Sequence, residues 1–212
     1  MSNDRMSVVL AAMADVDGDA DSAIDRVCAA GVTLLSLKGA GLSLMVDGEL
    51  RGTAGVSDPG IALMQELQLS LGEGPGVDAW RGSAAVLEPD LSDPVVVRWP
   101  AFAQAGVEAG VRAVFAFPLA LGAAGIGGLV LYRDRLGALS ADELAYGLVL
   151  ADVATQVVLG LQAGAPAGTL HELLAKEPAQ AMTRSRTRPL LSAPDPGRGA
   201  LQDPGYGCVA GI

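Results

Sequence analysis

The feature that most constrains this chain is a stretch rich in glycine and proline, LSLGEGPGVDAWRGSAAVLEPD, at residues 69–90. Between Gly72 and Gly76, three of the five residues are glycine and one is proline. Such a run breaks both helices and strands, and it permits backbone angles that other residues resist. The stretch therefore predicts a fixed turn that redirects the chain between a helix and a sheet.

The residues before this turn predict a helix, a hairpin and a second helix. Apolar residues recur at helical spacing from 22 to about 35, with Cys28 on the buried face. Asp47-Gly48 separates two apolar runs, and Asp-Gly in this position is a strong hairpin signal. Ser57-Asp58-Pro59 supplies a cap and an early proline for the second helix. The apolar positions of that helix are Ile61, Met64, Leu67 and Leu71.

The residues after the turn predict short elements and then a second hairpin. A short helix at 77–82 and a strand at 84–87 are followed by a helix that begins at Arg98-Trp99-Pro100. The segment 113–132 is free of charge and long enough to span a membrane. It contains Pro118 and four glycines, however, which divide it into two strand-length runs, so it favours a buried hairpin.

The last predicted helix runs from Ser140 to Leu161. Ser140 and Glu143 have the spacing of a capping box. The helix is apolar almost all round, more than one sheet face can cover, which predicts a homodimer through it. Asp152 and Gln156 would then mark the rim, and glutamate at Val149 and Val153, or at whichever of the two is exposed in a monomer, would give folded monomers.

Charge and composition exclude several classes of function. The net charge of −10 opposes binding to nucleic acid and to anionic membranes. The only histidine, His171, lies outside the proposed domain, and Cys28 and Cys208 are far apart. Triads that use histidine and metal sites built from histidine or cysteine are therefore not expected, so the chain is predicted to be neither an enzyme nor dependent on a cofactor. Two unpaired cysteines and the absence of a signal-peptide pattern favour the cytoplasm.

Composition also divides the chain. We expect an N-terminal segment at 1–21, a domain at 22–162, a linker at 163–180 and a disordered tail at 181–212. The first of these ends in an acid-rich run that departs from a calcium loop at Ala20 and Arg26. The tail has no hydrophobic period and many Pro, Gly and Arg residues. It carries a net charge of +2, so residues 1–180 carry −12.

Four motifs resemble the GAF domain, a small-molecule sensor module, and in particular the GAF half of actinobacterial GAF-ANTAR regulators. The motifs are LxLGEGPxxDAWRxG-x-V-x-PDL, RWPAF, AGVRAVFAFPL and GxLxLYRDxxGxLS. The resemblance covers about Ser22 to Gln162. The resemblance implies an α/β (α+β) fold in which a central antiparallel sheet has helices on both faces.

The resemblance also implies a ligand pocket between the sheet and the loops that follow the Gly/Pro turn. The aromatic residues that could line such a pocket are Trp80, Trp99, Phe102, Phe115 and Phe117. Packing in the core is the competing interpretation of these side chains. Of the pattern in cyclic-nucleotide-binding GAF domains, only the charge types at Arg133 and Glu143 match, so no ligand class is indicated.

Two functions follow from the resemblance. The first is a non-catalytic sensory or regulatory module, which binds an unidentified small molecule or acts as a dimeric signalling platform. The alternative is an RNA-binding transcription antitermination regulator whose output domain is missing or degraded. In GAF-ANTAR proteins a helical bundle follows a linker similar to APAGTLHELLAKEPA, and this chain departs from that pattern after Ala179.

Overall fold

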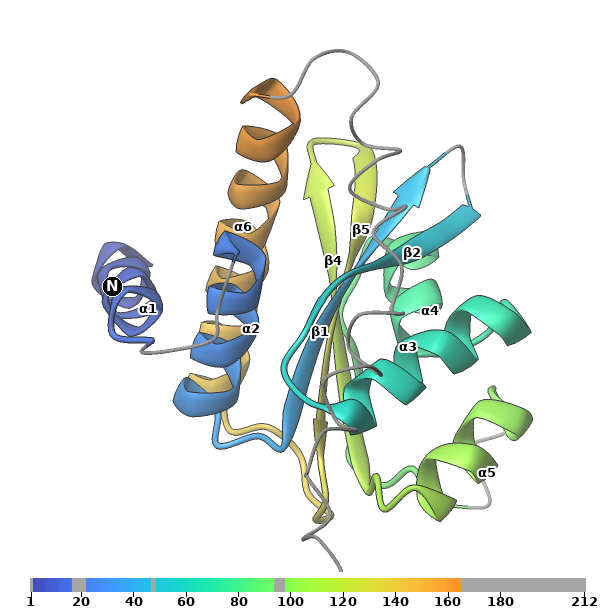
Figure 1. The fold of residues 1–212 in the computed structure, drawn as a ribbon. Coiled ribbons are helices and arrows are strands. Elements are labelled where there is room, and N and C mark those ends of the chain that lie inside the picture. Colours follow the sequence, from blue (N-terminus) through green and yellow to red (C-terminus); the bar gives the residue numbers. More distant parts are fainter. Residues whose placement is uncertain (1, 17–21, 47–48, 94–97, 165–212) are drawn as a thin grey trace, which may run out of the picture. The chain divides into compact units, whose positions relative to one another are not determined.

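The computed structural model describes residues 2–16, 22–46, 49–93 and 98–164. Five strands form one antiparallel sheet in the order β2-β1-β5-β4-β3. Helices α2 and α6 pack on one face with α1 against them, and α3, α4 and α5 lie on the other (Figure 1). The expected fold class is confirmed. The strands are β1 (Gly39–Val46), β2 (Glu49–Val56), β3 (Val86–Glu88), β4 (Ala113–Leu121) and β5 (Ala124–Arg133). The helices are α1 (Ser2–Ala14), α2 (Ala23–Leu34), α3 (Pro59–Leu71), α4 (Pro75–Gly82), α5 (Pro100–Glu108) and α6 (Ala141–Gly164).

The sheet separates two apolar clusters, because side chains alternate between its faces along each strand. On β1, Leu42 and Leu44 belong to the cluster under α2 and α6. On β4, Phe115 and Phe117 face the same cluster, whereas Val114 faces the cluster under α3, α4 and α5. Both faces of the central strands are therefore buried.

Both predicted hairpins are present. The segment 113–132 forms β4 and most of β5, as expected, and no part of it is a membrane-spanning helix. The second predicted helix begins at Asp58, whose carboxylate accepts from Gly60 N and Ile61 N. Its buried face differs from the prediction, however, because Leu71 is 43% exposed while Gln65 and Gln68 are buried.

Helix α6 is more enclosed than the sequence predicts. It packs on β4, α2 and α1, so its apolar surface is covered on several sides within one chain. Val149 and Val153 are only 7% and 4% exposed. The expectation that glutamate at these positions gives folded monomers is therefore wrong, since both side chains lie in the core.

By length and composition, α6 is also the one helix in the described ranges that could cross a membrane. About 44% of its most apolar window is buried inside the domain, where it contacts the sheet and two helices.

Helix α1 lies in the segment 1–21, which is expected from the sequence to be outside the domain. It packs against α2 and α6, with Val9 fully buried. Arg5 forms an ion pair with Asp142 at 2.8 Å and lies over the ring of Tyr146. Residues 17–21, which belong to the acid-rich run, lie outside the described residues, and so does the predicted tail at 181–212.

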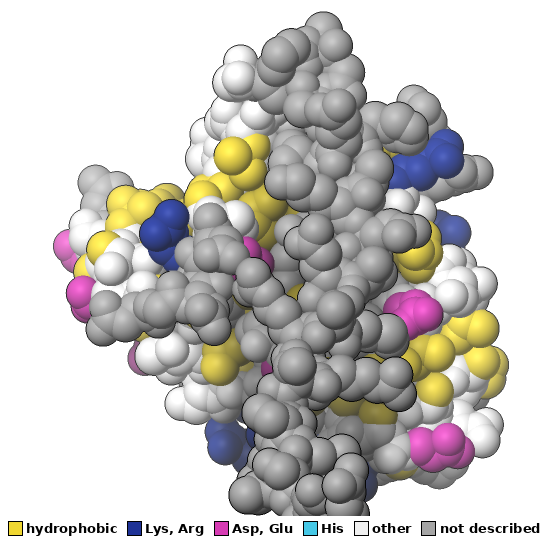
Figure 2. Space-filling view, viewed as in Figure 1, with side chains coloured by type: hydrophobic (Ala, Val, Ile, Leu, Met, Phe, Trp, Pro, Cys, Tyr) yellow, Lys and Arg dark blue, Asp and Glu magenta, His cyan; other side chains and the backbone are white. Residues whose placement is uncertain are grey.

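Several large apolar side chains stay at the surface. Some lie on α1 and α6, and others lie on α3. Figure 2 shows these two groups on opposite sides of the view. The most exposed on these helices are Val8, Leu10, Leu63, Leu69, Leu71, Leu148 and Leu161.

Candidate ligand-binding site

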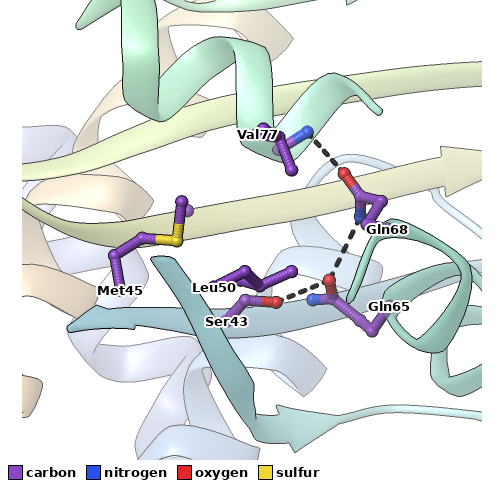
Figure 3. A pocket seen from close by; sticks show the side chains of 8 residues that line it. Ser43, Met45, Leu50, Gln65, Gln68 and Val77 are labelled. Atoms are coloured by element: carbon purple, nitrogen blue, oxygen red, sulfur yellow. Dashed lines mark hydrogen bonds between the residues drawn. The ribbon is translucent and has the colours of Figure 1, made fainter. Parts of the chain in front are cut away.

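A small cavity lies on the face of the sheet that carries α3 and α4. Its volume is about 10 Å³, close to the room that one water molecule needs. Figure 3 shows side chains from the β1–β2 hairpin, α3 and α4 around it. The residues that line it are Ser43, Met45, Leu50, Gln65, Gln68, Gly76, Val77 and Gly128, none of which is charged.

A chain of hydrogen bonds joins three sides of this cavity. Gly76 N donates to Gln68 Oε1 at 2.7 Å, and Gln68 Nε2 donates to Gln65 Oε1 at 3.2 Å. The hydroxyl of Ser43 donates to the same Gln65 Oε1 at 2.6 Å. The two glutamines, three residues apart on one face of α3, therefore connect the start of α4 to β1.

One polar atom in this group has no partner. Gln65 is 1% exposed, and its Nε2 finds no acceptor among the described residues. A buried donor without an acceptor costs about 1–3 kcal/mol. Gln65 Nε2 is thus a buried donor that a water molecule or a ligand in this cavity would satisfy.

Glycines allow α4 to approach the sheet and α3 closely enough to form this site. A Cβ on Gly128 would lie 3.3 Å from the carbonyl oxygen of Gly76, and one on Gly76 would lie 2.8 Å from Val130 Cγ2. Gly74 has a φ of 137°, which residues other than glycine rarely adopt. The Gly/Pro turn therefore has a specific role, because it sets the α4 backbone directly above β5.

The same turn also holds α5. Glu73 Oε1 accepts from Ala101 N and Phe102 N at 3.2 Å each, so it caps the start of α5 from a distant part of the chain. In α4, Asp78 Oδ2 accepts from Trp99 Nε1 at 2.9 Å. These contacts join the GEGPGVDAW and RWPAF motifs in the folded chain.

The five aromatic residues predicted for the pocket do not converge. Trp99 and Phe102 pack edge to face, with centroids 6.1 Å apart, in the cluster under α3, α4 and α5. Phe115 and Phe117 lie on the opposite face of the sheet, under α2 and α6. Trp80 is half-buried and donates to Gly125 O at 3.2 Å. None of the five lines the cavity.

Sequence reasoning missed the residues that do line it. A signal was available, because Gln65 and Gln68 follow Ile61 at helical spacing and so share its buried face. A polar side chain on an otherwise apolar helix face requires a partner when buried.

A second group of polar side chains links the C-terminal end of β5 to the N-terminal end of α6. Arg133 is 4% exposed and pairs with Glu143, while its Nη2 also donates to Leu35 O at 3.1 Å. Ser140 N donates to Glu143 Oε2 at 2.7 Å, which confirms the predicted capping box. Burial opposes ionisation of Glu143, but the hydrogen bonds from Ser140 and the charge of Arg133 outweigh it and lower its pKa. The one charge pair that matches the cyclic-nucleotide pattern is therefore a structural contact here.

Other reactive groups in the described residues are enclosed. Cys28 is fully buried, and burial, with a smaller effect of Asp25, raises the pKa of its thiol to about 12. Burial and a hydrogen bond to Asp58 raise the pKa of Tyr132. Within the described ranges, no three His, Cys, Asp or Glu residues are grouped so that they could hold a metal ion.

No family model matches the sequence, and no curated protein matches it. Solved structures do match. The GAF domain of a phosphoenolpyruvate-protein phosphotransferase from Coxiella burnetii superposes with a TM-score of 0.55 at 15% identity, covering 77% of this chain and 95% of that one. A domain assigned to a two-component sensor histidine kinase protein of Sinorhizobium meliloti gives 0.55 at 15% identity, with 69% and 95% covered.

An enzyme has the same fold. Free methionine-R-sulfoxide reductase from Neisseria meningitidis, solved in complex with its substrate, gives a TM-score of 0.53 at 16% identity, covering 77% of this chain and 92% of that one. At such identities the likeness shows the fold alone. The expected GAF-like architecture is therefore confirmed, and the function has to be argued from the residues.

Proposed function

We propose that this chain, whose fold is that of GAF domains, is a cytoplasmic, non-catalytic sensory or regulatory module that binds a small molecule at the cavity between β1, α3 and α4. The observation that carries the proposal is the buried Gln65 Nε2, which has no acceptor among the described residues. A buried donor of this kind is normally satisfied by a protein group, an ordered water or a ligand. The proposal agrees with the sensor kinase protein among the structural neighbours.

The chemistry of the described residues supports a non-catalytic role. A reactive cysteine must be accessible and easily deprotonated. Cys28 is neither, since it is fully buried and its pKa is raised. The likeness to a sulfoxide reductase therefore concerns the fold alone. Nothing at Cys28 supports a thiol reaction.

The alternative, an RNA-binding antitermination regulator of the GAF-ANTAR type, depends on residues after 162. Only 163 and 164 of these belong to the described part. The alternative thus remains a prediction from the sequence, and the net charge of −10 opposes it.

A thermal-shift measurement tests the proposed function. The small-molecule fraction of an extract from the native host is added to the full-length protein, to Gln65→Met and to Thr155→Val. Thr155 is a suitable control because it is also buried and hydrogen-bonded, to Ala151 O, but lies on α6 across the sheet.

We expect the extract to raise the midpoint of the wild type and of Thr155→Val by several degrees, because a ligand that binds only the native state stabilises it. Gln65→Met should show little or no shift. The proposal is contradicted if no extract stabilises the wild type, or if Gln65→Met is stabilised equally.

A further inference from the structure

The orientation of both glutamine amides at the cavity is fixed by a backbone group. Gly76 N–H can only donate, so Gln68 must turn its Oε1 toward it. Gln68 Nε2 then donates to Gln65, which places Oε1 of Gln65 in the acceptor position. Rotating the Gln65 amide by half a turn would set its Nε2 against Gln68 Nε2, donor against donor. The direction of these hydrogen bonds therefore leaves both N–H groups of Gln65 Nε2 available as donors.

This arrangement specifies a hydrogen-bond acceptor. In Figure 3 the Gln65 amide is turned toward Ser43 and Leu50, two of the lining residues. A carbonyl or other acceptor oxygen can bind Nε2, whereas a group that only donates cannot.

Charge at the site favours a neutral ligand. No Lys, Arg or His is among the eight lining residues to balance an anion, and no Asp or Glu is among them to balance a cation. Burying an ion without a partner is strongly unfavourable. The N-terminus of α4 adds little attraction for an anion, because Gly76 N already has an acceptor and Asp78 lies in the first turn.

The remaining lining side chains are apolar, and they would contact a short aliphatic group once the cavity widens beyond the volume of one water molecule. Met45, Leu50 and Val77 form the apolar part of the cavity. Met45 pairs with Leu50 near the end of the β1–β2 hairpin, next to a register shift after Leu44, and β2 is an edge strand. Methionine adapts its shape readily, so this wall can yield to a ligand larger than water.

We propose that the ligand is an uncharged small molecule whose carbonyl oxygen accepts from Gln65 Nε2 and whose short aliphatic group lies against Met45 and Leu50. This inference rests on the proposed function and adds the chemical class of the ligand to it.

Three probes with one hydrocarbon group and different heads test the class: isobutyramide, isobutyrate and isobutylammonium. Each is titrated at neutral pH into the full chain, labelled on methionine methyl groups and glutamine side-chain amides, and followed by NMR. Comparison with Gln65→Met and with a Met45→Leu variant assigns the two reporting signals.

Isobutyramide should shift the Gln65 amide and the Met45 methyl together, and it should bind at least about tenfold more tightly than either ion. In Gln65→Met that response should disappear, while in Thr155→Val it should persist. Equal binding of an ion, or no response to the amide, overturns the proposed class. Such a result leaves the proposed function intact if the extract still stabilises the wild type, so the two failures can be distinguished.

Discussion

At the scale of single residues, the Gly/Pro turn acts through side chains that contact distant elements. Glu73 caps α5, Asp78 binds Trp99, and Gly76 orients Gln68. A substitution in the turn should therefore weaken an element about thirty positions further along the chain.

Removing the cap should show this effect. In Glu73→Ala, two backbone N–H groups at the start of α5 lose their acceptor, which should lower the free energy of unfolding by about 0.5–2 kcal/mol. Glu66→Ala, on the exposed side of α3, is the matched control and should change it little. Urea unfolding measures both, and equal losses in the two variants would show that Glu73 has no special role.

Glu143 should make stability depend on pH. Its pKa is lowered in the folded chain, so it stabilises the fold above the ordinary value of 4.5. That contribution should be lost as the pH falls from about 4.5 through the lower pKa of the folded state. Glu143→Gln should therefore lose less stability than the wild type over this acid range. Chemical denaturation at a series of pH values tests it, and parallel curves for the two proteins would contradict it.

The residues of the candidate site show where sequence reasoning stopped. The helix carrying Gln65 and Gln68 could be predicted from Asp58, Pro59 and the apolar spacing. The spacing from Ile61 places Gln65 and Gln68 on its buried face, but Leu71 fits the helical period as well, so spacing alone does not choose between Gln68 and Leu71. The enclosed side of α3 is set by the elements it packs on, which are β1, β2 and α5, and by the hydrogen bond from Gly76 to Gln68.

At the scale of elements, α6 can be apolar on several sides because three neighbours cover it. They are the sheet, α2 and α1. The sequence indicates too much apolar surface for one sheet face, and that inference is sound as far as it goes. What it lacks is α1, whose packing against α2 and α6 cannot be read from a short apolar run near an acid-rich segment. The extra apolar surface of α6 is thus partly covered from within the chain.

Two glutamate substitutions on α6 should separate its buried and exposed sides. Val153→Glu places a charge in the core and should cost about 4 kcal/mol or more. Leu148→Glu lies at a position that is 49% exposed and should leave the fold nearly unchanged. Circular dichroism during thermal unfolding distinguishes them, and similar midpoints would mean that α6 is not packed as described.

At the scale of the whole molecule, the homodimer through 140–161 remains a proposal with different contact residues. The large side chains that a partner can reach on α6 are Leu148 and Leu161, at 49% and 38% exposure. Covering two such leucines from each chain contributes about 3–5 kcal/mol. Association costs about 4–15 kcal/mol, so a dimer through α6 alone should be weak.

Analytical ultracentrifugation over a range of concentrations tests the dimer. The wild type should associate only at high concentration, and Leu148→Glu should abolish the association. Leu63→Glu, at a similarly exposed position on α3, should have no effect. A dimer that survives Leu148→Glu but not Leu63→Glu would place the interface on the other face of the sheet.

The central claim is that Gln65 Nε2, which has no acceptor among the described residues, binds a small molecule. Native mass spectrometry of the full chain, purified from its native host, tests it most directly. We predict one bound small molecule per chain in the wild type and in Thr155→Val, and none in Gln65→Met. A wild-type protein with no bound molecule, or one that Gln65→Met retains, would contradict the claim.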